Sequence, residues 1–229
     1  MRIKFWGTRG SVPVPGPKTV KYGGNTPCTE FSLDDGSRLI IDAGTGIINL
    51  GRELMAGEFK EGKGRLVILI SHTHWDHIQG VPFFAPQFVE GNQITYMGKS
   101  SKDKSVLEIL EGQLRAPYSP IYSLENLFAD IRCESLPEGS FKSGSFHVTP
   151  FSVSHPSPAN GFIIEAEGKK AVYCSDAEHC KGALDEVVLN AADGADLLIH
   201  DAQFTAKEYN YRNGWGHSSW DTAVRVARV

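Results

Sequence analysis

Short apolar runs, separated by glycine, proline and charged residues, recur along most of this 229-residue chain. Runs of about four to eight apolar or β-branched residues predict buried strands, whereas apolar residues three or four positions apart predict helices. We expect strands at residues 2–6, 28–33, 38–41, 66–70, 93–97, 141–153, 161–166, 170–174 and 196–199. Helices are expected at residues 47–57, 105–114 and 183–192, and again after residue 218. This mixture indicates an α/β (α+β) protein.

Two pairs of neighbouring strands are joined by short turns. Asp34-Asp35-Gly36-Ser37 separates the second expected strand from the third, and Glu167-Gly168-Lys169 separates the seventh from the eighth. Short turns that contain glycine are typical of β-hairpins. Both pairs are therefore expected to be antiparallel.

The apolar strand at residues 66–70 leads into a cluster of histidine and aspartate side chains, His72-Thr73-His74-Trp75-Asp76-His77. In an extended chain, residues two apart point the same way, so His72 and His74 can face one point. Asp76 and His77 can face a second point close by. Imidazole and carboxylate groups are zinc-type ligands, and α/β sheets place ligand sites at the carboxyl ends of strands. The cluster therefore predicts a metal site.

Other expected strands also end in histidine or aspartate. These strand-end residues are Asp42, His155, Asp176, His200 and Asp201. The ends of different strands in a layered sheet protein can converge on one edge. We therefore expect one site assembled from distant parts of the sequence.

Composition and charge narrow the class of protein. A hydrophobic content of 41% is enough for one domain over residues 1–229, and a net charge of −4 argues against a general nucleic-acid-binding surface. The amino terminus lacks the apolar region of a signal peptide, and no apolar run approaches the roughly 20 residues of a membrane span. The cysteines form no Cys-x-x-Cys pair, which is typical of reduced thiols in a cytoplasmic protein. They are Cys28, Cys133, Cys174 and Cys180.

The run from His72 to His77, followed in order by His155 and Ser175-Asp176, resembles the metallo-β-lactamase-fold hydrolase superfamily. The resemblance covers nearly the whole chain, including the turn Asp42-Ala43-Gly44. It implies a four-layer αββα sandwich with a dinuclear metal site at one edge. It leaves the substrate open, because lactamases, thioesterases, lactonases, nucleases and phosphodiesterases share these motifs.

The resemblance also assigns metal ligands. It implies that one metal is held by His72, His74 and His155, that a second is held by Asp76 and His77, and that Asp176 bridges the two. Such a donor set suits Zn²⁺, with Mn²⁺ or Fe as alternatives. A hydroxide shared by two metals could then attack the substrate, and Asp76 is also expected among the catalytic residues.

The segment Gly216-His217-Ser218-Ser219 resembles the Gly-His-Ser/Thr segment of the phosphodiesterase branch, which includes tRNase Z and cyclic phosphodiesterases. In that branch the histidine protonates the leaving oxygen, a role typically worth about 10²–10⁴-fold in rate. We expect His217 to act in this way, Asp201 to support it, and Ser218 to cap the following helix. His200 is expected to pack or hydrogen-bond locally, and His179 to lie on the surface.

One feature departs from the branch. Its members continue into another strand that ends in a histidine ligand of the second metal, whereas no histidine follows His217 before Val229. Three explanations compete: a truncated sequence, a His217 that turns to the metal, or a weakened second site. We expect truncation, with the last strand of the fold missing.

The function expected from these features is a metal-dependent phosphodiesterase acting on a cyclic nucleotide or another small phosphodiester. RNA is less favoured, because the chain is acidic and has no long Gly/Pro/basic insertion of the kind that tRNase Z uses to grip tRNA. The alternatives are a thioester, lactone or lactam hydrolase, a tRNA 3′-end endonuclease, and a non-catalytic metal-binding domain. No membrane partner is expected, and a homodimer is compatible with the sequence.

Overall fold

The computed structural model describes residues 1–100, 104–117, 119–121, 123–179 and 183–229. The chain divides into two compact units, one formed by Arg2–Leu136 and the other by Pro137–Val229 together with Met1. Each unit is built on one sheet. Cys180 lies outside the described residues, and the other three cysteines are free thiols.

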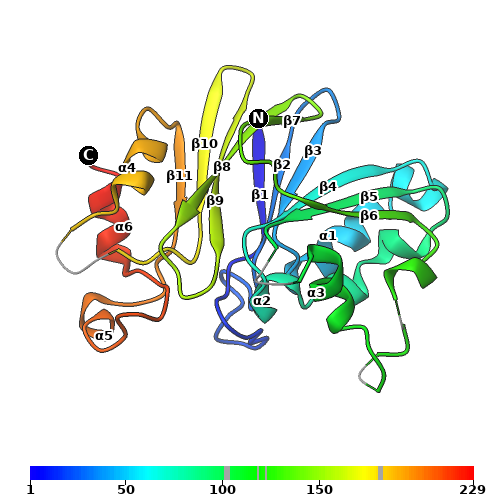
Figure 1. Cartoon of the computed structure of the whole chain (residues 1–229), viewed down its shortest axis with the longest axis horizontal. Helices are drawn as coiled ribbons and strands as arrows, with labels where there is room; N and C mark the ends of the chain where they lie inside the picture. The colour runs from blue at the N-terminus through cyan, green and yellow to red at the C-terminus, as the bar shows by residue number, and fades with distance from the viewer. Residues whose placement is uncertain (101–103, 118, 122, 180–182) are drawn as a thin grey trace. The chain divides into compact units, whose positions relative to one another are not determined.

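The amino-terminal unit contains a six-stranded sheet in the order β1-β2-β3-β4-β5-β6 (Figure 1). The first two pairings are antiparallel, and those from β3 to β6 are parallel. The strands are β1 (Arg2–Gly7), β2 (Cys28–Ser32), β3 (Arg38–Ile41), β4 (Arg65–Ile70), β5 (Gln93–Gly98) and β6 (Asp130–Ser135). The helices are α1 (Gly46–Leu54), α2 (Trp75–Ile78) and α3 (Val106–Gly112). Parallel pairing places the ends of β3 and β4, which precede the strand-end polar residues, at one edge of this sheet.

Strands β3 and β4 are buried because they are central and almost wholly apolar. Ile40, Ile68 and Ile70 have no exposed surface, and helix α1 packs its apolar face, including Ile47 and Leu50, into the same core cluster. A strand covered on both faces needs apolar residues at successive positions, which is the pattern of residues 66–70. This core fixes the strand end at which the histidine cluster begins.

The carboxy-terminal unit contains a five-stranded sheet in the order β11-β10-β9-β8-β7. Among the described strands of this sheet, β10 and β11 pair in parallel and the other neighbours are antiparallel. The strands are β7 (Phe141–Ser143), β8 (Phe146–Val153), β9 (Ala159–Ala166), β10 (Lys169–Cys174) and β11 (Leu197–His200). The helices are α4 (Glu186–Ala192), α5 (Ala206–Tyr209) and α6 (Trp220–Val226). Helix α4 packs against β8, β10 and α6 (Figure 1).

Both expected hairpins are present. Strands β2 and β3 pair in antiparallel fashion, as do β9 and β10. Glu167 and Gly168 both have positive φ angles, +53° and +69°, as a two-residue hairpin turn requires. Strand β6 was not expected, because Asp130–Ser135 is a mostly exposed edge strand without a buried apolar run.

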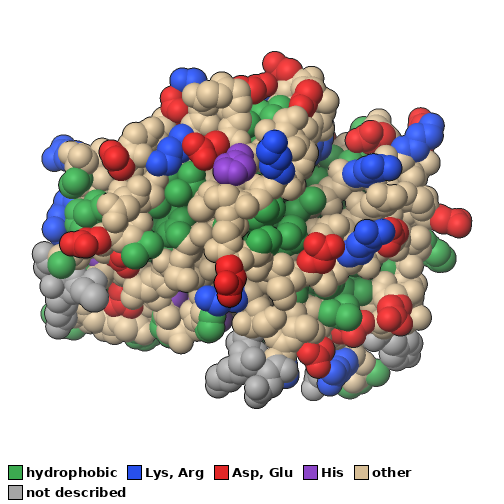
Figure 2. Space-filling view, turned by 45° about the horizontal axis from the view of Figure 1, so that its top comes forward, with side chains coloured by type: hydrophobic (Ala, Val, Ile, Leu, Met, Phe, Trp, Pro, Cys, Tyr) green, Lys and Arg blue, Asp and Glu red, His purple; other side chains and the backbone are tan. Residues whose placement is uncertain are grey.

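The surface carries no single sign of charge on the face drawn in Figure 2, where Lys and Arg side chains are interspersed with Asp and Glu. None of the helices in the described parts of the chain has the length and apolar content that a bilayer span requires.

Candidate metal centre

The histidine cluster of the amino-terminal unit is anchored on Asp42, the residue after β3. Because β3 and β4 are parallel neighbours, the Asp42 N–H donates to the Leu69 carbonyl at 2.8 Å. The Asp42 carboxylate then accepts two hydrogen bonds from Ser71, one from the backbone N–H at 2.8 Å and one from the hydroxyl at 2.9 Å. Asp42 is fully buried and has a φ of +66°, a conformation that L-residues rarely adopt. Such strain is typical of a functional site.

The three histidines of the cluster lie together. The ring centroids of His72 and His74 are 4.6 Å apart, and those of His72 and His77 are 4.2 Å apart. Helix α2 brings His77 back toward the strand end, since its backbone N–H donates to the His74 carbonyl at 3.0 Å. The pattern of residues 72–77 therefore gathers imidazole groups at the end of β4.

Asp42 also orients His77. The Nδ1 atom of His77 lies 2.8 Å from Asp42 Oδ2, and both side chains are fully buried. A hydrogen bond to the carboxylate selects the tautomer with the proton on Nδ1, so Nε2 carries the lone pair that a metal requires. His77 Nε2 lies 3.6 Å from Asp76 Oδ2, so these two donor atoms can face one ion.

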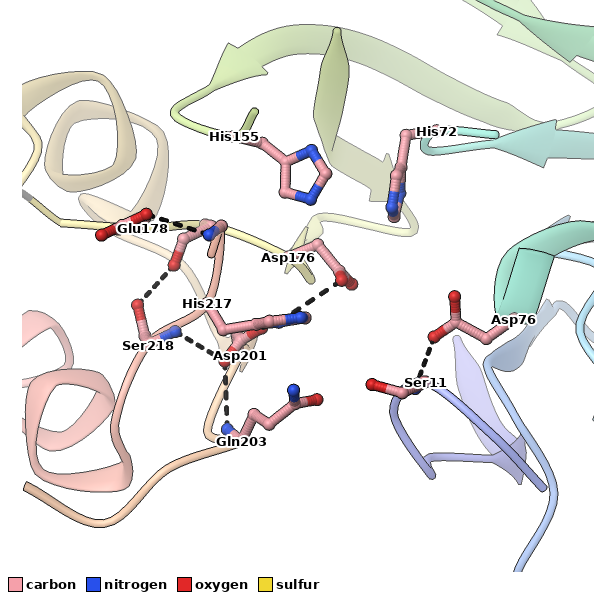
Figure 3. A network of polar contacts seen from close by, with 12 residues as sticks. Ser11, His72, Asp76, His155, Asp176, Glu178, Asp201, Gln203, His217 and Ser218 are labelled. Carbon is pink, nitrogen blue, oxygen red and sulfur yellow. Dashed lines mark hydrogen bonds and ion pairs between the residues drawn. The ribbon is translucent and has the colours of Figure 1, made fainter. Parts of the chain in front are cut away.

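Asp76 is held by the glycine- and proline-rich loop near the amino terminus. The backbone N–H of Ser11 donates to Asp76 Oδ2 at 2.7 Å, as Figure 3 shows. Ser11 has a φ of +68°, so the loop adopts an uncommon conformation at this contact. The loop therefore orients one of the expected ligands.

The carboxy-terminal unit brings three further strand-end or motif residues together. Asp176 follows β10 and Asp201 follows β11, and the parallel pairing of these strands places the Asp201 N–H 2.9 Å from the Cys174 carbonyl. The Nδ1 atom of His217 lies 2.7 Å from Asp201 Oδ2 and 3.4 Å from Asp176 Oδ1. The donor atoms of these three side chains all lie within 4.8 Å of one another (Figure 3).

Asp201 is fixed by hydrogen bonds on both oxygens. Its Oδ1 accepts from the backbone N–H of Ser218 at 2.8 Å and from that of Gln203 at 3.1 Å, while Oδ2 faces His217. The carboxylate therefore holds the His217 ring by Nδ1 and leaves Nε2 as the atom that can exchange a proton with a substrate.

His155 lies in the same unit, two residues after β8. Its Nδ1 lies 3.0 Å from the Ser157 carbonyl and 3.1 Å from the Ser157 hydroxyl, and it also faces the Ser157 backbone N–H at 3.3 Å, so Ser157 holds the ring in either tautomer. Its ring centroid is 6.5 Å from that of His217. Gly216 permits this approach, since a Cβ atom there would lie 2.1 Å from His155 Cδ2.

Glu178 holds the loop that carries His217, a role that the sequence did not reveal. Its carboxylate accepts from the backbone N–H groups of Gly214 at 2.5 Å and Gly216 at 2.9 Å. Ser218 was expected to cap α6, which is wrong: the N-cap residue is Ser219, and the Ser218 hydroxyl donates to the Ala177 carbonyl. Ser218 is instead a second attachment of this loop.

We predict that Gly216→Ala lowers both the stability and the activity of the protein. Gly214 and Gly216 have nearly equal φ angles, +84° and +85°, but a Cβ at Gly214 meets nothing within 4 Å. Gly214→Ala therefore reports the backbone strain alone, about 1–2 kcal/mol. Gly216→Ala should cost more in a thermal melt because it also displaces His155. Equal losses in the two variants would contradict the proposed crowding.

His179 is buried, so the expectation that it lies on the surface is wrong. It pairs with His200 at an Nε2–Nε2 distance of 3.0 Å, and its Nδ1 accepts from the Asp185 N–H at 2.8 Å. His179 therefore donates through Nε2 to His200, whose Nδ1 donates to the Asp201 carbonyl at 2.7 Å. His200 forms local hydrogen bonds, as expected. Both rings are neutral in this arrangement.

We predict that stability falls as the pH drops below 6.5. Burial, with a smaller effect of His200, lowers the pKa of His179 to about 4, while Asp185 opposes the shift. In the unfolded chain histidine titrates near 6.5, so between these values the unfolded state binds the extra proton and the folded state is disfavoured. The melting temperature should fall by roughly 2–4 °C for each 1 kcal/mol lost.

The variant His179→Gln should show a flatter dependence of melting temperature on pH between 7 and 4. His147→Gln is the matched control, because His147 is exposed beside Glu165. Parallel curves for the wild type and His179→Gln would contradict this assignment.

Within each unit the side chains fit divalent metal binding. His77 has Nδ1 engaged by an oxygen acceptor, the usual second contact of a metal-ligating histidine. Imidazole and carboxylate donors together suit zinc and related ions. The family pattern implies that side chains from the two units bind the same ions, and this stays a prediction. The roles of the individual ligands also stay predictions.

Comparisons with known proteins agree with this chemistry. The profile of the Beta-lactamase superfamily domain matches residues 37–229. Ribonuclease Z of Metallosphaera sedula is 24% identical over 216 residues, which cover 71% of this chain and 66% of that protein. Ribonuclease Z of Haloarcula marismortui is 24% identical over an alignment of 275 positions, which covers 100% of this chain and 82% of that protein.

A solved structure shows the same fold. The crystal structure of human tRNase Z, short form, matches with a TM-score of 0.66 at 21% sequence identity, over 99% of this chain and 87% of that chain. The expected mixed α/β fold with two sheets is thereby confirmed.

Proposed function

Because this chain belongs to the beta-lactamase superfamily domain family and is a hydrolase of the metallo-β-lactamase fold, we propose that it cleaves phosphodiester bonds in RNA. The observation that carries the phosphodiester chemistry of this proposal is the contact of His217 Nδ1 with Asp201 Oδ2 at 2.7 Å. A carboxylate on Nδ1 stabilises the imidazolium form, whose Nε2–H can protonate a leaving oxygen. A phosphodiester expels an alkoxide, which needs such a proton more than a thiolate does.

The metal ligands are proposed as the family pattern assigns them. One ion would be held by His72, His74 and His155 and a second by Asp76 and His77, with Asp176 as a further ligand. When bound, such ions supply Lewis-acid polarisation of the phosphate and an acidified water, which makes a separate protein base unnecessary. Zinc suits these donors, with Mn²⁺ or Fe as alternatives.

The other residues of each set position these groups. Asp42 holds His77 and Ser71, and the Ser11 N–H holds Asp76. Asp201 and Glu178 fix the His217 loop from two sides. Catalysis then depends on groups that are pre-oriented before the substrate binds.

RNA is preferred over a small phosphodiester because the curated relatives described above are ribonucleases. This preference replaces the one drawn from the sequence. A small phosphodiester is the second candidate, supported by the net charge of −4 and by the mixed charges of Figure 2. The Haloarcula alignment also runs over 275 residues against 229 here, so that enzyme carries segments without a counterpart in this chain.

A hydrolysis panel tests the proposal. The metal-loaded protein is offered a tRNA precursor with a 3′ trailer, a cyclic nucleotide, a thioester and a lactone at equal concentrations. We expect cleavage of the RNA with the highest kcat/KM. Preference for the cyclic nucleotide would support the second candidate, and preference for the thioester or lactone would refute phosphodiester chemistry.

A further inference from the structure

An exposed tryptophan lies two residues before His217, on a backbone that is held in place. Trp215 is 58% exposed, although large apolar rings are usually buried. The residues on either side of it, Gly214 and Gly216, both donate backbone N–H groups to the Glu178 carboxylate. The Trp215 ring is therefore exposed to solvent on a loop whose backbone is fixed by hydrogen bonds.

A row of stacked groups connects this ring to His217. The Arg212 guanidinium lies 5.0 Å from the centroid of Trp215 and 5.3 Å from that of Phe204. Phe204 in turn meets the His217 ring edge-on at 5.8 Å. Phe204 is buried and is fixed by backbone hydrogen bonds to Ser218 and Trp220, so the row has a rigid base.

From this arrangement we propose that Trp215 and Arg212 form a stacking platform for a nucleobase of the substrate, on the side of the leaving group. The proposal rests on the proposed function, because His217 delivers its proton to the leaving oxygen. An aromatic face binds any base by stacking, and the adjacent guanidinium adds cation–π attraction and a positive charge for phosphate. Glu208 is near Arg212 but is occupied by its capping contacts with Thr205.

Binding and turnover are tested together. Adenosine 5′-monophosphate is titrated against ribose 5-phosphate by tryptophan fluorescence on the full, metal-loaded chain. Hydrolysis is measured on a diribonucleotide and on its analogue that lacks the base of the leaving nucleoside. The readout is the ratio of kcat/KM with and without the base.

In Trp215→Ala this ratio should fall by about 5- to 100-fold, the range expected for loss of one base–aromatic stack. Arg212→Gln should lower it less, and Trp215→Phe should recover most of it. Phe5→Leu, which removes an exposed ring from β1, is the matched control and should keep the wild-type ratio.

Equal losses on the two substrates would mean that Trp215 only supports the loop, and would overturn the proposal. An adenosine 5′-monophosphate titration indistinguishable from that of ribose 5-phosphate would also overturn it. Failure of the proposed function can be distinguished from failure of the platform. In that case the wild type would hydrolyse neither substrate, whereas Trp215-dependent binding of adenosine 5′-monophosphate would still support the platform.

Discussion

Replacing His217 by alanine is expected to lower kcat on an RNA phosphodiester by about 10²–10⁴-fold, the usual contribution of a positioned general acid. The reason is geometric: Asp201 holds Nδ1 at 2.7 Å, so His217 is the group oriented to donate through Nε2. The measurement is single-turnover cleavage at saturating protein concentration, with metal content determined on the same sample.

Two further variants are needed to interpret the loss of activity in His217→Ala. Asp201→Asn keeps the shape of the side chain but removes the charge that stabilises the imidazolium, so a loss of the same order, up to about 10⁴-fold, is expected. His147→Ala removes an exposed histidine from β8 and should leave the rate near the wild-type value. A His217→Ala variant that retains full activity and full metal content would exclude the acid role.

Withdrawal of metal should have an equally large effect. Lewis-acid catalysis is worth several kcal/mol, so dialysis against a chelator should lower hydrolysis by roughly 10³-fold or more. Re-addition of Zn²⁺ or Mn²⁺ should restore it. The melting temperature should rise on re-addition, because an ion that binds only the folded state stabilises it.

The variant His77→Ala tests one of the assigned ligands. It should bind less metal than the wild type, whereas His147→Ala should bind the same amount. Hydrolysis that survives exhaustive chelation, verified by elemental analysis, would contradict a metal-dependent mechanism.

Much of the fold could be predicted because apolar runs and turn residues are local signals. Strand β4 and the hairpin around Gly168 follow directly from such patterns. Strand β6 could not be predicted, since this mostly exposed edge strand has only Ile131 and Cys133 as apolar positions among polar residues. The extent of the domain stays a prediction.

In the candidate site, too, some contacts could be predicted from the sequence and others could not. Asp201 and His217 could be paired in advance because the segments that carry them resemble motifs of the phosphodiesterase branch. The role of Glu178 could not be predicted, because it contacts backbone N–H groups of Gly214 and Gly216, which lie far along the chain. His179 was misplaced because no local pattern distinguishes a buried histidine from an exposed one.

Proton donation by His217 can be measured through the leaving-group dependence of hydrolysis. A series of phosphodiesters, with leaving groups that range from a nitrophenolate to a simple alkoxide, is measured with the wild type and with His217→Ala. We predict a shallow dependence for the wild type and a steep one for the variant, with the two rates closest for nitrophenolate. Parallel dependences for the two proteins would contradict proton donation by His217.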